Sequence, residues 1–165
     1  MVKRHNVKFG HAFERRVADA FARNGYAQLR KNHWMYVYDS SRDSASKREF
    51  DLVLFSMPEK RFCIVECKAH YTRDVLVPAV QVQEFHSKLK NHPSKGAHHL
   101  MVTDNSFTKS AEVYASQSGI KLMDGRALER LDYAGNAYLR IRSKACSFLM
   151  KKADYFLDEL ISSYF

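Results

Sequence analysis

Hydrophobic residues first recur at helical spacing near the start of the chain. An apolar side chain stands at every fourth position, at Phe9, Phe13, Val17 and Phe21. The pair Asn24-Gly25 follows and is typical of a helix end. The pattern therefore predicts an amphipathic helix that ends at this pair.

The spacing then changes to alternation. In NHWMYVYD, residues 32–39, Trp34, Tyr36 and Tyr38 alternate with Met35 and Val37, which predicts a strand. The aromatic stripe favours a packing surface over a base-stacking platform. The polar, Ser-rich segment SSRDSASK, residues 40–47, predicts a flexible loop.

The rest of the chain mixes both periods. EFDLVLF (49–55) and RFCIVECKA (61–69) read as strands joined by the short turn SMPEK, a hairpin. Further on, the pattern predicts a helix over 77–89, a strand over 98–103, a helix over 107–119, a strand over 120–123 and a short helix from 124. A strand–helix–strand crossover makes its two strands parallel. Apolar residues at helical spacing over 138–165 predict a long C-terminal amphipathic helix.

The hairpin brings two acids together. If the turn is centred between Pro58 and Glu59, Asp51 lies opposite Glu66 at the end of an otherwise apolar face. Opposed like charges are destabilising, so a positive group is expected between them. Lys68 is one candidate, two residues and roughly 7 Å further along the same face.

A divalent cation is the better candidate for that positive group. Two carboxylates and water form the hard oxygen site that magnesium prefers, and the backbone carbonyl of Cys67 is a further candidate ligand. Such a site suits phosphodiester hydrolysis, with Lys68 orienting the attacking water or offsetting charge on the phosphate. The alternative is a solvent-facing hairpin end with an ordinary ion pair between Lys68 and either acid.

Composition narrows the class of protein. The chain has 165 residues, 45% of them hydrophobic, which suits one domain with its own core. The net charge of +9 favours anionic partners, nucleic acid among them. Three cysteines without CxxC spacing indicate reduced thiols, and no apolar run reaches membrane-spanning length. The expectation is a cytoplasmic protein.

The order of the motifs resembles a known superfamily. GHAFERRVADAFARNGY, then REFDLVLF, then CIVECK look like the PD-(D/E)xK nucleases. The later stretches VQVQEFHSKL and HHLMVTDNSFTKSAEVYASQSGIKLMDGRAL resemble the Mrr-type restriction endonuclease domain more narrowly. The resemblance covers about residues 9–131 and implies a restriction-endonuclease-like α/β fold, a central mixed β-sheet flanked by helices. We thus expect a nuclease domain over 1–131 and a C-terminal helical extension over 132–165, packed on the core or used in oligomerisation.

The resemblance also assigns roles. Asp51 and Glu66 match the metal-binding acids and Lys68 the catalytic lysine, although the first motif reads FD rather than PD. Glu14 matches an acid that assists the metal in related nucleases. Gln83 matches a glutamine on the following helix, with Gln81 as the alternative if the helix register differs.

The function predicted is a magnesium-dependent DNA endonuclease, with Mn²⁺ as a substitute ion. Basic residues flanking the two motif strands would clamp the DNA backbone: Arg42, Lys47, Arg48 and Arg73. Two alternatives remain, a resolvase specific for branched structures such as the Holliday junction and a non-catalytic DNA-binding module with a nuclease fold. The C-terminal helix is a candidate contact for a homodimer or a larger complex.

Overall fold

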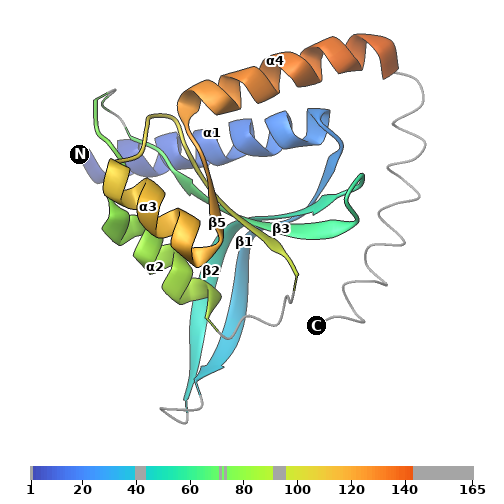
Figure 1. The fold of residues 1–165 in the computed structure, drawn as a ribbon. Helices are drawn as coiled ribbons and strands as arrows, with labels where there is room; N and C mark the ends of the chain where they lie inside the picture. Colours follow the sequence, from blue (N-terminus) through green and yellow to red (C-terminus); the bar gives the residue numbers. More distant parts are fainter. Residues whose placement is uncertain (1, 40–43, 71, 73, 91–95, 143–165) are drawn as a thin grey trace.

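A computed structural model describes residues 2–39, 44–70, 72, 74–90 and 96–142. Nine elements follow one another in these ranges (Figure 1): α1 Val2–Arg23, β1 Tyr26–Asp39, β2 Ser44–Ser56, β3 Arg61–Lys68, α2 Ala79–Leu89, β4 His98–Thr103, α3 Lys109–Ser118, β5 Ile120–Met123 and α4 Gly125–Arg142. Local chemistry sets several of their ends. Gly25 and Gly119 follow α1 and α3 with φ of 84° and 70°, a conformation that glycine adopts without strain. The Thr108 side chain accepts from the Ala111 N–H and caps the start of α3.

The five strands form one mixed sheet in the order β1-β2-β3-β4-β5. The pairs β1–β2 and β2–β3 are antiparallel, whereas β3–β4 and β4–β5 are parallel. The expected antiparallel meander followed by a parallel crossover is confirmed, and so is the α/β class. Parallel neighbours arise because α2 and α3 carry the chain back across the sheet.

Two apolar clusters cover the two faces of the sheet. One cluster packs Leu52 and Val65 against Phe13 and Val17 of α1 and Leu128 of α4. The other packs side chains of the opposite face, including Ile64 and Met101, against α2 and α3. Figure 1 shows the same layers, with α1 beside α4 and α2 beside α3.

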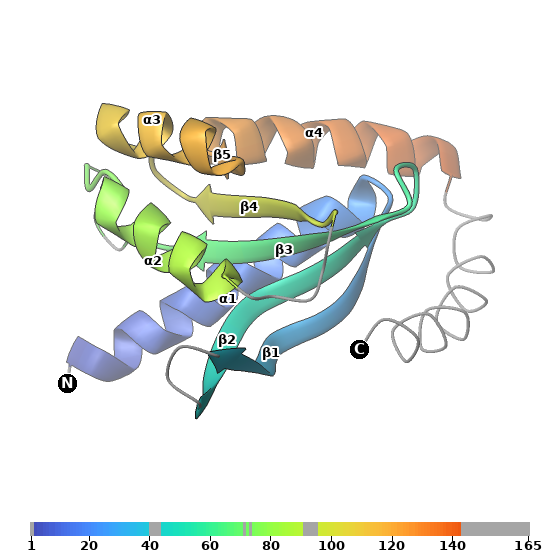
Figure 2. The ribbon, with the colours of Figure 1, turned by 60° about the horizontal axis from the view of Figure 1, so that its bottom comes forward.

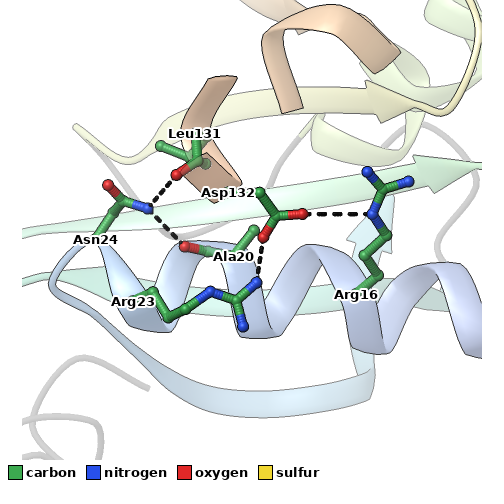
Figure 3. Close-up of polar contacts among 6 residues, drawn as sticks. All are labelled: Arg16, Ala20, Arg23, Asn24, Leu131 and Asp132. Carbon is green, nitrogen blue, oxygen red and sulfur yellow. Dashed lines mark hydrogen bonds and ion pairs between the residues drawn. The ribbon is translucent and has the colours of Figure 1, made fainter. Parts of the chain in front are cut away.

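Polar contacts join α1 to α4 (Figure 3). The Asn24 amide donates to the carbonyl oxygens of Ala20 at 2.8 Å and Leu131 at 2.9 Å, and Arg23 donates to the Asp132 carboxylate. The two helices approach so closely that a Cβ at Gly135 would lie 2.7 Å from the Arg23 Cβ. The two helices therefore pack closely against each other and, through the first cluster, against the motif strands.

Several boundaries differ from those expected. β1 begins at Tyr26 and β2 already at Ser44, so residues 44–47, expected as loop, pair with β1. The short helix expected over 124–131 continues to Arg142, because Leu128 and Leu131 pack on the first cluster and the helix follows α1. The rest of the predicted C-terminal helix, residues 143–165, lies outside the described residues. No helix in the described ranges is long and apolar enough to cross a membrane.

Candidate active site

The register of the β2–β3 hairpin is the one expected. Val53 pairs with Ile64 and Phe55 with Phe62, and the ladder ends at Leu52↔Val65. Beyond that pair a side chain replaces the backbone as the partner of β3: the Asp51 Oδ2 accepts the Cys67 N–H at 2.7 Å. Asp51 is thus fixed to the backbone of the neighbouring strand rather than held only by its own.

Strand β2 changes its facing at Asp51. Phe50 and Leu52 stand two residues apart and would share one face of a regular strand. They lie instead in the two opposite core clusters. The neighbouring strand is irregular at the same place, since Asn32, between the partners of Leu52 and Phe50, has φ of 49°. The change of facing therefore falls at Asp51, whose carboxylate bonds to the backbone of β3.

Glu66 is 2% exposed and is held by two lysines. Its Oε1 accepts from Lys68 Nζ at 2.9 Å and from Lys88 Nζ at 2.7 Å. Its Oε2 is buried and has no hydrogen-bond partner among the described residues. A buried polar atom without a partner is costly, so this oxygen is available to a ligand that brings its own positive charge.

The site perturbs the pKa values of Asp51, Lys68 and Cys67. Burial, and then the charge of Glu66, raise the pKa of Asp51 to about 6, although the Cys67 N–H opposes this. Burial opposes protonation of Lys68, yet the Glu66 carboxylate outweighs it and raises the pKa of that ammonium above its ordinary value. The thiol of Cys67 has a pKa well above its usual range, chiefly because it is buried. Lys68 is therefore charged and the thiol is neutral at pH 7.

The donor set fits a hard divalent cation. It comprises the Asp51 carboxylate, Glu66 Oε2 and the Cys67 carbonyl. Cys67 N–H points to Asp51, and the N–H and C=O of one strand residue point to the same side, so the carbonyl faces Asp51 as well. Across the described ranges, no three His, Cys, Asp or Glu side chains group so as to hold a metal, so the site rests on two side chains and a carbonyl. Water completes such a shell for magnesium.

Glu14 belongs to this neighbourhood. Its side chain on α1 is 12% exposed and lies 3.6 Å from Lys31 Nζ and 3.3 Å from His11 Nδ1. Its charge also contributes to the raised pKa of Asp51. The structure thus places Glu14 where its charge acts on Asp51.

Gln83 is not brought to the acids. It is exposed and lines a depression between α2 and α3, together with Tyr114 and Gln117 of α3. Gln81 lies on another face of α2, where its Oε1 is buried without a hydrogen-bond partner among the described residues. Helical spacing places Gln81 on the same face as Lys88, two turns on. The alternative, Gln81, is therefore the glutamine on the Glu66-facing side.

The basic residues proposed to bind DNA differ in what they contact. Lys47 is exposed, whereas Arg48 donates to carbonyl oxygens in the last turn of α2, among them Lys88 O at 2.9 Å and Ser87 O. The Arg48 guanidinium therefore holds a helix end rather than projecting from the strand. Arg42 and Arg73 lie outside the described residues.

Lys88 is the site residue that the sequence did not indicate. It stands 22 positions from Glu66, and only the packing of α2 on the sheet brings the two together. The sequence did contain a weak signal for Lys88, since residues 81, 84 and 88 share one polar helix face. Nothing in the sequence says which edge of the sheet that face meets.

Comparisons with known proteins agree with the fold. A family model described as "Restriction endonuclease" (Mrr_cat) matches residues 8–131. No curated protein is similar enough to be matched. Among solved structures, the chain is similar to Can2 from Sulfobacillus thermosulfidooxidans in complex with cyclic tetra-adenylate (TM-score 0.57, 18% identity, 79% of this chain and 36% of that one). It is also similar to a protein of unknown function, AF1548 (0.56, 18%, 68% and 57%), and to VC1899 from Vibrio cholerae (0.54, 15%, 76% and 33%). The chain spans between a third and just over half of the length of these structures, and at such identity they support the fold alone.

Proposed function

On the premise that this chain belongs to the restriction endonuclease (Mrr_cat) family, we propose that it is a metal-dependent endonuclease that hydrolyses DNA phosphodiester bonds. The observation that carries the proposal is the convergence of Asp51 and Glu66, with Glu66 Oε2 buried and without a hydrogen-bond partner in the described part of the chain. A scaffold residue would not leave a carboxylate oxygen in that state.

In this proposal Asp51, Glu66 and the Cys67 carbonyl hold Mg²⁺, and Mn²⁺ substitutes for it. When bound, the ion supplies Lewis acidity at a phosphate oxygen and lowers the pKa of water. Asp51 is already oriented, because the Cys67 N–H fixes its Oδ2. Its carboxyl must lose a proton before it can serve as a ligand, which the raised pKa makes incomplete below pH 6.

Lys68 acts on the substrate. Its ammonium remains charged beside Glu66 and can donate to the attacking water or to a phosphate oxygen as negative charge develops there. Lys88 holds the same Glu66 oxygen, so Glu66 keeps its orientation when Lys68 turns toward substrate. In this proposal Lys88 positions Glu66, and Lys68 takes part in the reaction.

The test uses supercoiled plasmid with magnesium, with and without chelator. We expect nicking that requires the metal and is lost in Lys68→Ala, whereas Lys109→Ala, which removes an exposed lysine of α3, leaves it unchanged. Cleavage restricted to four-way junctions would select the resolvase alternative. DNA binding without any cleavage would select the non-catalytic module and refute the proposal.

The organisation of the chain is proposed on the same basis. A nuclease domain over 1–131 and an extension over 132–165 remain our division, although α4 runs through that boundary. Cleavage of both strands requires two sites, which the proposed homodimer would supply through the extension. The substrate suggests a cytoplasmic location.

A further inference from the structure

Strands β1 and β2 continue past the edge of β3 as a two-stranded ribbon. The β2–β3 ladder ends at Leu52↔Val65, but β1 and β2 stay paired from His33↔Phe50 to Asp39↔Ser44. We call residues 33–39 and 44–50 the β1–β2 ribbon; seven residues extend roughly 20 Å. Figures 1 and 2 show this end of the two strands projecting away from the rest of the sheet. The ribbon begins at the residue next to Asp51.

One face of the β1–β2 ribbon is anchored to the protein. Phe50 is fully buried in the cluster that contains side chains of α2, and Arg48, on the same face, donates to the last carbonyls of that helix. Alternation along β2 then places Lys47 and Glu49 on the opposite face, which points away from α2. Lys47, Glu49 and their neighbour Trp34 belong to neither core cluster.

The opposite face carries an exposed aromatic side chain. Trp34 pairs with Glu49 and is 48% exposed. The Lys47 ammonium lies 4.1 Å from its ring centroid, a cation–π contact that orients the ring. Trp34 was expected to belong to a packing surface, yet it is a large apolar ring held in solvent beside a positive charge. Tryptophan is enriched at interfaces, because its large ring contributes much contact area, so this ring suits contact with a partner.

We infer that this face of the β1–β2 ribbon, with Trp34 and Lys47 at its base, lies in the major groove of the duplex whose phosphodiester occupies the Asp51–Glu66 site. The inference rests on the proposed endonuclease function. The major groove is about 12 Å wide and admits a two-stranded ribbon, whereas the minor groove, about 6 Å wide, does not. Trp34 lies opposite a residue two positions from Asp51, roughly 7 Å along the strand, so this face lies within reach of DNA seated at the acids. The positive charge of Lys47 and the net charge of +9 complement that occupant.

Trp34 is the single tryptophan of the chain, so its emission reports on this face without labelling. The experiment titrates Lys68→Ala protein, which does not cleave, with a fluorescein-labelled duplex of about two helical turns in magnesium. Anisotropy of the label measures binding, and Trp34 emission is followed in a parallel titration with unlabelled duplex. We expect the emission to change and to saturate at the same DNA concentration as the anisotropy.

Matched variants test the energetics. Trp34→Ala should weaken duplex binding about tenfold, the loss expected when a large aromatic contact is truncated, and Trp34→Phe much less. Tyr133→Ala removes an aromatic side chain of α4 that is 80% exposed and should leave affinity unchanged. Lys47→Gln should lower the slope of log affinity against log salt by about one unit. Circular dichroism melting confirms that each variant folds.

The outcomes separate the two proposals. Duplex binding with constant Trp34 emission, and with unchanged affinity in Trp34→Ala, would overturn the ribbon contact and leave the endonuclease standing. Tighter binding of single-stranded DNA than of duplex would overturn the groove assignment. Absence of any DNA binding would overturn both.

Discussion

Asp51→Asn gives the sharpest test of the site, because the change alters charge but not shape. Asn keeps an oxygen that can accept the Cys67 N–H, whereas the negative charge facing Glu66 disappears. The pKa of Asp51 is raised from 3.8 to about 6 in the folded protein. At 1.36 kcal/mol per pKa unit, the ionised carboxylate costs up to about 3 kcal/mol of folding free energy.

The sign follows from linkage. The folded-state pKa of Asp51 lies above the unfolded-state value, so the folded protein binds this proton more tightly. The resulting stability is present below about pH 4, declines as pH rises through about 6 and is absent above that. Metal-free Asp51→Asn protein should therefore melt higher than the parent at pH 8, by up to roughly 10 °C for a chain of this size, and the difference should vanish at pH 4.

Differential scanning calorimetry from pH 4 to 8 in chelator measures this difference. In magnesium the parent should gain stability at pH 8, since the ion removes the repulsion, whereas the variant should gain little. Asp19→Asn, which changes an exposed carboxylate of α1, serves as the control and should follow the parent. A variant that melts below the parent at pH 8, or magnesium stabilisation that survives the substitution, would refute the reasoning.

Three further predictions concern the supports of the site. Lys88→Met should lower the rate of plasmid cleavage tenfold to a hundredfold, because it removes a charged hydrogen bond worth about 1.5–3 kcal/mol. It should also shift the acid limb of the pH–rate profile to higher pH, because Lys88 lowers the pKa of Asp51. Lys90→Met is the control, and equal rates in the two variants would contradict a role for Lys88. Gly135→Ala should lower the free energy of unfolding by about 1–3 kcal/mol, because its Cβ would meet α1. Gly10→Ala, where nothing lies within 4 Å of the added Cβ, should raise that free energy by about 0.5–1 kcal/mol, and urea denaturation measures both. Arg48→Met should cost about 1 kcal/mol of stability by releasing the end of α2, without changing the salt slope of DNA affinity; a lowered slope would restore the phosphate-clamp interpretation.

The periodicity of the chain was sufficient for most of the fold. Alternation in EFDLVLF and RFCIVECKA, with the short turn between them, predicts the register in which Val53 meets Ile64, and the structure has that register. It succeeds because a hairpin register depends on a local turn and on which side chains avoid water. The parallel crossover from β4 to β5 followed from equally local evidence.

Local sequence patterns were least informative where a strand irregularity or a distant contact determines how a side chain is placed. Strict alternation predicts a direct Asp51–Glu66 pair, but the strand twists at Asp51 and its carboxylate bonds to Cys67 N–H. The aromatic stripe was expected to pack, yet β3 stops pairing with β2 at Leu52, before the partner of Trp34, and the Trp34 ring is 48% exposed. Both outcomes depend on where a neighbouring strand stops pairing, which no period in the sequence records.

Sequence alone determined most of the helices and strands of the described residues, their order and the two acids at the end of one hairpin, because hydrophobic burial acts on patterns a few residues long. Only the tertiary structure decided that Lys88 reaches Glu66 and that Gln81 rather than Gln83 lies on that side. The physical reason is rotational. The face that α2 turns to the sheet edge depends on how its apolar side chains interdigitate with the second cluster, and a rotation of one residue step, about 100°, would exchange Gln81, Gln83 and Lys88 for their neighbours.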